Sequence, residues 1–371
     1  MKSIPNAFLT PPIVYAVDHS YQIMVPVTCE LVMWAEVGGK SFYDDSNGIL
    51  RSSCSTHRMT VPMELLDREK HYRIGYRVIR ERKPYFTEAE DAAYYESDFR
   101  PIEREPIHIY HIADAHNEIE RPVAAGSYFG KNLDLLILNG DIPNHSGAIE
   151  YFAAIHQIAG QLTSGEIPVV FSRGNHDMRG IFAEQIADHT PTDNGRSYYT
   201  FRLGALWGLV LDCAEDKPDD HPAYGFMNCC EDFRRRETEF IKSVIANAQT
   251  EYEAEGIKNR IVVVHNPFTQ TLEEPFDIEQ ELYREWATLL REHVKPDMMI
   301  CGHMHDAYIS HKGDKTDHKG QPCPVVVASQ RSKDGPYAGG AFVLYPDRCE
   351  VRITDDKGAI GLSETLYFSE A

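Results

Sequence analysis

The sequence lacks several features that mark common protein classes. Its eight cysteines show no Cys-x-x-Cys spacing, which argues against a zinc knuckle, and they form no dense disulfide framework. Cys229 and Cys230 could form a vicinal disulfide, but free thiols are the expected state. No run approaches the roughly 20 apolar residues of a membrane-spanning helix, and residues 1–12 contain no apolar core of a signal peptide. We therefore expect a cytoplasmic protein without a membrane partner.

Positive charge is also scarce. The chain has 37 Lys and Arg against 57 Asp and Glu, which gives a formal net charge of −20. This charge argues against a broad nucleic-acid-binding face, so we expect no long nucleic acid as a partner. A small phosphorylated substrate is still compatible with it, because bound divalent cations would reverse the local charge. The sequence does not define the oligomeric state.

Two compositional regions follow one another along the chain. Residues 1–85 contain short β-like runs separated by Asn-, Asp- and Gly-rich breaks, which indicates a small all-β sandwich. Residues 86–106 are acidic and poor in strand signals, so we expect a linker there. Residues 107–371 alternate short apolar strands with helical patterns and end in β-rich sequence. This order favours an α/β (α+β) fold whose core is a two-sheet β-sandwich flanked by helices.

The helical patterns of the second region are recognised by apolar residues at helical spacing. They cover residues 146–162, where Ser146 is expected to cap the helix, and residues 231–255 and 277–293. The run Arg234-Arg235-Arg236 is expected to be a solvated helix surface, and His156 a buried core histidine.

Five short polar motifs each follow an apolar run in the second region. They are Asp114-Ala115-His116, Gly140-Asp141, Gly174-Asn175-His176-Asp177, Val264-His265-Asn266 and Gly302-His303-Met304-His305. Functional side chains gather where the strands of an α/β sheet end, so the motifs should meet at one edge. Their oxygen and imidazole ligands suffice for two metal ions and suit manganese, iron, zinc or cobalt better than calcium. One motif alone is weak evidence, but the ordered set is a strong signal.

Residues 107–345 resemble the calcineurin-like metallophosphoesterase superfamily, which carries this motif series in this order. The resemblance implies phosphomonoester or phosphodiester hydrolysis by a metal-bridging hydroxide, with His176 as general acid and Asp177 orienting its ring. The implied ligands are Asp114, His116 and His305 for the first ion, Asn175, His265 and His303 for the second, and Asp141 bridging both.

The N-terminal β-rich region resembles the fibronectin III-like sandwich that precedes the catalytic domain of purple acid phosphatases. The likeness stops at two ligand positions. Purple acid phosphatases carry a tyrosine iron ligand where this sequence has Asn144, and a glycine where it has His116. We therefore expect a non-purple centre with two transition metal ions, such as manganese, iron or zinc.

Asn144, His145 and Arg173 are weaker candidates for contacts with the substrate. Asn144 could orient a metal ligand or a phosphate oxygen, Arg173 fits a structural ion pair equally well, and His145 fits a turn equally well. The long acidic loop at residues 212–230 is either a substrate wall or a neutral surface excursion.

Two other functions compete with phosphoester hydrolysis. A catalytically silent scaffold for protein binding should lack ligands, whereas all seven are in the sequence. A nuclease acting on a long strand should have a basic stripe, which this acidic chain does not have. A nucleotide-directed phosphodiesterase stays open. The ligand set favours a binuclear metal-dependent phosphoester hydrolase acting on a small substrate.

Overall fold

Two large β-sheets form the centre of the computed structural model, which describes residues 3–332 and 335–368. The first is a ten-stranded sheet. Its strands, in spatial order, are β23 (Ile360–Tyr367), β22 (Arg348–Asp355), β21 (Tyr337–Leu344), β11 (Ile107–Ile112), β12 (Leu135–Asn139), β13 (Pro168–Ser172), β1 (Ile13–Val17), β2 (Ser20–Pro26) and β7 (Thr56–Pro62), with β20 (Gln330–Arg331) beside β21. The neighbours β11, β12, β13 and β1 run parallel.

The second large sheet has six strands. They are, in spatial order, β14 (Tyr199–Leu203), β15 (Leu206–Leu211), β16 (Asn259–Val264), β17 (Met298–Cys301), β19 (Val325–Val327) and β18 (Tyr308–Ser310). The neighbours β15, β16, β17 and β19 run parallel.

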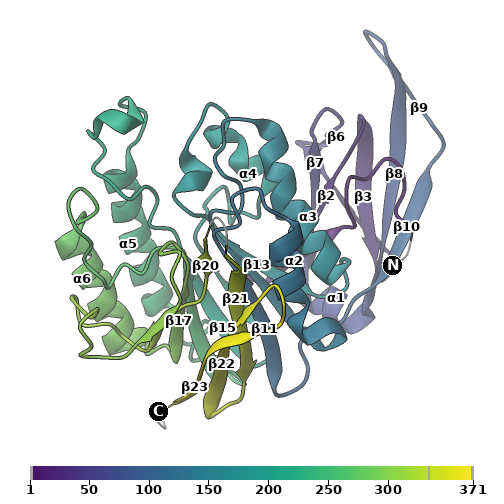
Figure 1. Cartoon of the computed structure of the whole chain (residues 1–371). Coiled ribbons are helices and arrows are strands. Elements are labelled where there is room, and N and C mark those ends of the chain that lie inside the picture. Colours follow the sequence, from purple (N-terminus) through teal and green to yellow (C-terminus); the bar gives the residue numbers. More distant parts are fainter. Residues whose placement is uncertain (1–2, 333–334, 369–371) are drawn as a thin grey trace.

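Helices cover the outer face of each large sheet. α2 (Glu120–Gly126) and α3 (Ala153–Thr163) pack on the first sheet, and α5 (Cys230–Ala246) and α6 (Gln280–Leu289) pack on the second. Figure 1 shows these two pairs on opposite flanks. The other helical segments are α1 (Met63–Glu69), α4 (Ile186–His189), 3₁₀ turns at Ser127–Asn132, Ile149–Phe152, His176–Met178, Ala183–Gln185 and Pro222–Tyr224, and a π turn at Leu290–Val294. Within residues 3–332 and 335–368, no helix is long and apolar enough to cross a membrane.

Alternate residues of the central strands fill two different cores. On β12, Leu135 and Ile137 enter the core between the sheets, whereas Leu136 and Leu138 pack under α2 and α3. Parallel strands that are buried on both faces read as continuous apolar runs, which is why the sequence revealed them. Their shared direction brings their carboxyl ends to one edge of the structure.

The N-terminal region differs from the separate sandwich expected at residues 1–85. A third sheet contains β10 (Ala93–Asp98), β8 (His71–Arg82), β3 (Leu31–Val37) and β4 (Lys40–Tyr43), with β9 (Thr87–Ala89) beside β8, and it shares a core with β1, β2 and β7. However, β1 pairs directly with β13, Val14 with Pro168 and Tyr15 with Val169. The fibronectin III-like domain is therefore not confirmed, because one of the two facing sheets continues into the sheet of the second region.

Three local expectations were wrong. The segment 86–106, expected to be a strand-poor linker, contains β9 and β10, whose outward side chains are polar because they lie at sheet margins. Ser146 does not cap a helix, because its hydroxyl donates to the Asp177 carbonyl, and a 3₁₀ turn at Ile149–Phe152 precedes α3. The helix expected to reach residue 255 ends at Ala246.

Arg234 was also expected on the surface but is fully buried, unlike the exposed Arg235 and Arg236. Its guanidinium pairs with Glu279 and donates to the carbonyl oxygens of Cys213 and Glu215. It therefore ties α5 to the loop at residues 212–230. All eight cysteines are free thiols, as expected.

Candidate active site

All five polar motifs begin where a parallel strand ends. β11, β12, β13, β16 and β17 lead in turn to Asp114, Asp141, Asn175, His265 and His303. The backbone is left-handed, with φ between 47° and 71°, at Asp114, His116, Asp141, His303 and His305. This conformation costs a residue with a Cβ about 1 kcal/mol or more. Five of the seven candidate ligands therefore carry backbone strain.

Two glycines allow the motif loops to approach each other. A Cβ on Gly174 would lie 2.3 Å from Asp141 Oδ1. A Cβ on Gly302 would lie 2.5 Å from the Ala113 Cβ and 3.0 Å from Asp114 Oδ2. Any other residue at these positions would displace a carboxylate of the cluster.

The seven candidate ligands converge in overlapping groups of donor atoms. Asp114, His116 and His305 offer donor atoms within 4.8 Å of one another, and so do Asp141, His265 and His303. His305 Nε2 lies 3.3 Å from Asp114 Oδ1, and His265 Nε2 lies 3.3 Å from Asp141 Oδ2 and 3.8 Å from Asp114 Oδ1.

Asn175 Oδ1 lies 3.1 Å from His303 Nδ1, which brings the seventh side chain into the second group. The structure therefore brings together all seven residues that the sequence motifs predicted.

The donor atoms of this cluster fit bound cations. Among the described side chains, Asp114 Oδ1, His116 Nδ1 and His265 Nε2 are buried without a hydrogen-bond partner. His116 Nε2 and His305 Nε2 face each other at 3.1 Å, an approach that a cation ligated by such imidazoles would stabilise. A buried polar atom without a partner is costly, so these atoms are arranged as ligands rather than as a self-satisfied network.

The charges of the cluster point the same way. Burial opposes ionisation of Asp114 and Asp141, but the histidines beside them hold the pKa of both carboxyls below the usual range. Burial lowers the pKa of His116 and of His303 to about 4. Burial also opposes protonation of His265, but Asp141 and then Asp114 raise its pKa to about 10, and the hydrogen bond to Asp114 raises the pKa of His305. A cation bound between these aspartates would take the place of the extra protons on His265 and His305. Ionised carboxylates and neutral imidazoles are the forms that bind metal ions.

A surrounding layer of hydrogen bonds fixes the ligands, and the sequence motifs did not predict it. His265 Nδ1 donates to the Asn139 carbonyl oxygen at 2.6 Å, which turns Nε2 toward the two aspartates. Asn175 Nδ2 donates to Asp216 Oδ2 at 3.2 Å, which leaves Oδ1 facing His303. The Ser329 hydroxyl donates to Asp114 Oδ2. Such outer partners set the orientation of metal ligands.

His176 lies beside the cluster but is held differently from the expectation. Its Nδ1 donates to the Asn144 carbonyl oxygen at 2.8 Å, and its Nε2 lies 3.9 Å from Asp141 Oδ2. The expectation that Asp177 orients this ring was wrong. Asp177 Oδ2 instead accepts the backbone N–H groups of Gly174, at 2.6 Å, and Asp141, at 3.1 Å. Asp177 therefore ties two motif loops together.

Arg179 is the principal feature that the motifs did not reveal. Its Nε and Nη2 each donate at 2.9 Å to the buried Glu215 carboxylate, and Nη2 also reaches Asp216 Oδ1 at 3.2 Å. The remaining Nη1 lies 2.9 Å from His176 Nε2. The sequence offered one indication of this role, because Arg179 follows the Gly174-Asn175-His176-Asp177 motif by only two residues. Because Glu215 and Asp216 belong to the loop at residues 212–230, that loop borders the cluster.

The three candidates for substrate contacts lie in different environments. Asn144 is exposed next to His176, and its backbone N–H donates to Asn117 Oδ1. His145 Nδ1 accepts the Gly147 N–H at 2.9 Å, as in a turn. Arg173 forms a 2.7 Å ion pair with the buried Asp212, which matches the structural alternative. His156 is buried, as expected.

Comparison with known proteins supports the motif assignment. A family model described as calcineurin-like phosphoesterase matches residues 107–307, just over half of the 371 residues. The chain belongs to the calcineurin-like phosphoesterase family. This confirms the resemblance drawn from the five motifs.

Within this family, the chain is similar to a probable cyclic nucleotide phosphodiesterase of Fibrobacter succinogenes (strain ATCC 19169 / S85), with 29% identity over 126 residues. The match covers 31% of this chain and 48% of that protein, so it spans about half of the relative's length.

Two solved structures share the fold. The purple acid phosphatase PPD1 from yellow lupin (Lupinus luteus) seeds has a TM-score of 0.57 and 11% identity, covering 96% of this chain and 74% of its own. PhoD has a TM-score of 0.56 and 10% identity, covering 100% of this chain and 94% of its own.

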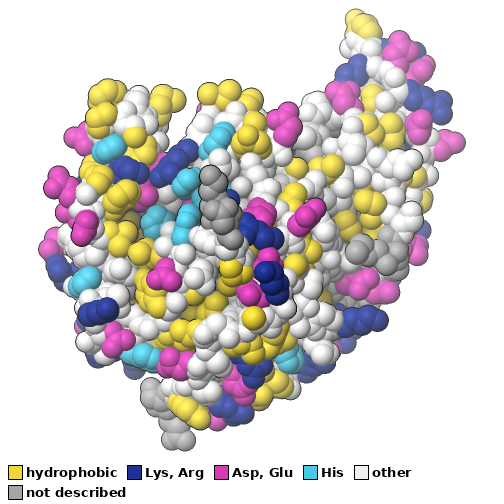
Figure 2. All heavy atoms as spheres, in the orientation of Figure 1, with side chains coloured by type: hydrophobic (Ala, Val, Ile, Leu, Met, Phe, Trp, Pro, Cys, Tyr) yellow, Lys and Arg dark blue, Asp and Glu magenta, His cyan; other side chains and the backbone are white. Residues whose placement is uncertain are grey.

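The ligand cluster of this family member opens into a hollow on the surface. Figure 2 shows histidine side chains gathered there, between two projections tipped with hydrophobic side chains. In Figure 1 the projections are the segment around α4 and the segment that leads into α5. These segments carry the exposed Ile181 and the exposed Phe226 and Met227, respectively.

A pocket adjoins His303 of the cluster and Asp216 of the loop at residues 212–230. It is lined by Asn266, Pro267, Phe268, Gln270, Leu272, Phe276, Ile278 and Tyr283. Its volume is about 30 Å³, which leaves room for a water molecule but not for a substrate group.

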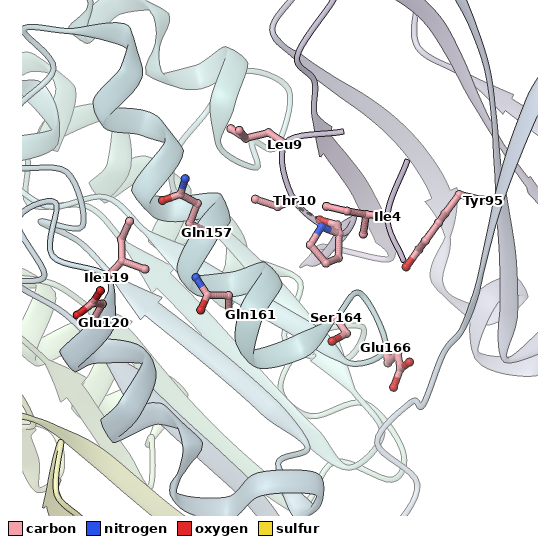
Figure 3. A pocket seen from close by; sticks show the side chains of 11 residues that line it. Ile4, Leu9, Thr10, Tyr95, Ile119, Glu120, Gln157, Gln161, Ser164 and Glu166 are labelled. Carbon is pink, nitrogen blue, oxygen red and sulfur yellow. Dashed lines mark hydrogen bonds between the residues drawn. The ribbon is translucent and has the colours of Figure 1, made fainter. Parts of the chain in front are cut away.

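A larger pocket lies elsewhere, between the N-terminal segment and α3, and Figure 3 shows Gln157 and Gln161 of α3 beside Leu9 and Thr10. None of its lining residues belongs to the motifs.

Proposed function

We propose that this chain is a metal-dependent phosphoester hydrolase whose reaction takes place at the cluster of the five motifs. The observation that carries the proposal is the convergence of seven ligands next to His176, of which five are buried, His303 is partly buried and His305 is exposed. Several of the buried donor atoms have no hydrogen-bond partner. Family membership supports it. A silent scaffold would have no need for an intact and strained ligand set.

Asp114, His116 and His305 would hold one ion, and Asn175, His265 and His303 a second, with Asp141 between them. Two bound divalent ions would supply the activated hydroxide and the positive charge that phosphoryl transfer requires. Manganese, iron and zinc all suit this mixed oxygen and imidazole set. Ser329, Asn139 and Asp216 hold three of the ligands in place.

His176 is the proposed general acid. Because its Nδ1–H is held by the Asn144 carbonyl, a second proton on the ring would sit on Nε2, which faces the cluster. Proton transfer from a positioned imidazole to a leaving oxygen typically contributes about 10²–10⁴-fold in rate. Asp177 contributes indirectly by fixing the loops of Asp141 and Gly174.

The decisive experiment combines metal analysis with two chromogenic esters. Protein purified without chelator should contain about two transition metal ions per chain and hydrolyse p-nitrophenyl phosphate or bis-p-nitrophenyl phosphate. Asp141→Asn should abolish this activity while leaving the circular dichroism spectrum unchanged. Wild-type turnover by Asp141→Asn at saturating metal would contradict the bridging role.

His176→Ala tests the proton transfer separately. We expect it to slow hydrolysis of alkyl phosphates, whose alkoxides are poor leaving groups, far more than hydrolysis of p-nitrophenyl phosphate. Equal losses on both substrates would exclude the general-acid role.

A second candidate substrate is a cyclic nucleotide. The relative named as a probable cyclic nucleotide phosphodiesterase supports this candidate. Phe276, which is 38% exposed, adds an accessible aromatic surface next to His303. A planar base could stack on the Phe276 ring. Hydrolysis of 3′,5′-cyclic AMP that exceeds hydrolysis of bis-p-nitrophenyl phosphate in kcat/KM, and that falls selectively in Phe276→Ala, would favour it. Indifference to Phe276→Ala would count against it.

A further inference from the structure

A second cluster of metal-ligating side chains lies outside the motif cluster, in the N-terminal region. Asp44, Cys54 and His57 offer a carboxylate oxygen, a thiol sulfur and an imidazole nitrogen within 4.8 Å of one another. Asp44 and His57 are buried, and Cys54 is partly buried. We propose that these three side chains bind a transition metal ion of the zinc type, separate from the phosphoesterase centre.

The spacing of the three donor atoms suits tetrahedral coordination. Cys54 Sγ lies 3.7 Å from Asp44 Oδ2 and 3.6 Å from His57 Nδ1. Zinc bonds of about 2.3 Å to sulfur and about 2.0 Å to nitrogen or oxygen put sulfur about 3.5 Å from either neighbour in a tetrahedron. The third edge, Asp44 Oδ2 to His57 Nδ1, measures 2.7 Å and is a hydrogen bond in this structure. Replacing its proton by a cation widens that edge to about 3.3 Å.

The environment of the cluster supports ligation. Arg51 approaches the other carboxylate oxygen, Oδ1, at 3.8 Å, so that Oδ2 stays directed at Cys54 and His57. Binding of a zinc-type ion releases the Cys54 thiol proton to solvent as the sulfur–metal bond forms. The ion also displaces the proton from His57 Nδ1, and the metal-bound neutral ring carries its one proton on Nε2. A polar pocket that Asp44 lines together with Asp45, Arg51 and Arg58 lies next to the cluster.

The structure also shows what such an ion would stabilise. Between Asp44 and Thr56 the chain forms a hairpin of two-residue strands, β5 (Asp45–Ser46) and β6 (Ile49–Leu50), and none of residues 45–55 is buried. An isolated two-stranded hairpin without a core is marginally stable in water. Asp44 precedes the hairpin, Cys54 follows it, and His57 belongs to β7 of the ten-stranded sheet. One ion would thus fasten both ends of the hairpin to that sheet.

Cobalt provides a direct test because the two sites differ in their ligands. The phosphoesterase cluster contains no cysteine, so a near-ultraviolet sulfur-to-cobalt charge-transfer band reports only on a thiolate site. We expect wild-type protein loaded with Co²⁺ to show this band and to bind one more cobalt ion per chain than Cys54→Ser. Cys54→Ser should lose the band and keep its circular dichroism spectrum. The matched control Cys29→Ser, at an exposed thiol of the same region, should keep both the band and the extra ion.

Two results would overturn the proposal. One is a wild-type protein without the band. The other is a band of equal intensity in Cys54→Ser. A second readout follows the hairpin itself, since Co²⁺ should slow hydrogen exchange at residues 45–55 in Cys29→Ser but not in Cys54→Ser. None of these measurements depends on phosphoester hydrolysis, so the proposed function and this site can fail independently.

Discussion

Replacing Arg179 by Gln tests how the site grips a phosphoryl group. Three of the contacts of Arg179 fix it, because Nε and Nη2 are bound by the buried Glu215 and by Asp216. Nη1 alone is directed at His176 and the cluster beyond it. Because the Arg179 side chain is already fixed, its Nη1–H can donate to a phosphate oxygen with little further loss of conformational entropy. Nη1 would then no longer donate to His176 Nε2, which would be free to carry the proton of the general acid.

The magnitude follows from the charge of the substrate. A hydrogen bond to a charged group is worth about 1.5–3 kcal/mol, and about 1.4 kcal/mol corresponds to a factor of ten, so kcat/KM for p-nitrophenyl phosphate should fall roughly ten- to a hundredfold. The diester bis-p-nitrophenyl phosphate carries half the charge of the monoester dianion. Its kcat/KM should therefore fall only roughly three- to tenfold.

The assay compares the two kcat/KM values at saturating metal, with metal content measured on the same samples. Lys217→Gln is the matched control, because Lys217 pairs with the same Asp216 carboxylate at 2.8 Å. If Arg179 only neutralises Asp216, both variants will lose activity equally on both esters. Equal losses of kcat/KM on the monoester and the diester in Arg179→Gln, or loss of bound metal, would refute the contact between Arg179 and the phosphoryl group.

Three further outcomes are expected from other parts of the chain. Asn139→Ala removes the side-chain donors to the Val264 and Ile300 carbonyl oxygens, next to the Asn139 backbone oxygen that holds His265. We expect metal affinity, measured by chelator competition, to fall about 10–100-fold. Unchanged affinity would show that the Asn139 side chain does not support the ligand His265. Tyr199→Phe leaves the Phe171 N–H and C=O without their hydroxyl partner and should cost about 2–4 kcal/mol of unfolding free energy in urea, whereas a loss below about 0.5 kcal/mol would contradict the reasoning. Burial, and then His189, lowers the pKa of His156 to about 3, whereas its pKa in the unfolded chain is about 6.5. Between these two pH values the unfolded chain binds more protons than the folded chain. The free energy of unfolding therefore falls as the pH drops below about 6.5. His156→Leu should reduce that acid slope by up to about 1.4 kcal/mol per pH unit in urea titrations at pH 5 and 6, and an unchanged slope would exclude His156 as its source.

The motif residues were predictable because their placement depends on local features. An apolar run followed by Gly-Asp or Gly-His predicts a strand end, and parallel strands bring their ends together. Asp177 shows the limit of such local reasoning. Its place next to His176 in the sequence suggested that it orients the His176 ring, but its carboxylate instead accepts backbone N–H groups from two loops. Arg179 and Asp216 meet only through the fold of the loop at residues 212–230.

The long-range pairings were beyond local pattern. Nothing near residue 14 indicates that β1 pairs with β13, because the pairing depends on which edge of the sheet is left open. Arg234 shows the same limitation at the level of one side chain. Its two neighbours in sequence face solvent, and only the carbonyls of the loop packed against α5 explain its burial.

The pairing of β1 with β13 means that the ten-stranded sheet cannot be excised as an autonomous fragment that begins at β11. During synthesis, β1 pairs with β2, which follows it directly, but its parallel partner β13 emerges only after β11 and β12. A truncation that began at residue 107 would leave β13 as an unprotected edge, with free N–H and C=O groups next to the loop that carries Asn175 and His176. Exposed apolar edges of this kind recruit strands from other chains, so such a fragment would aggregate. In the intact chain, β1 covers that edge of β13.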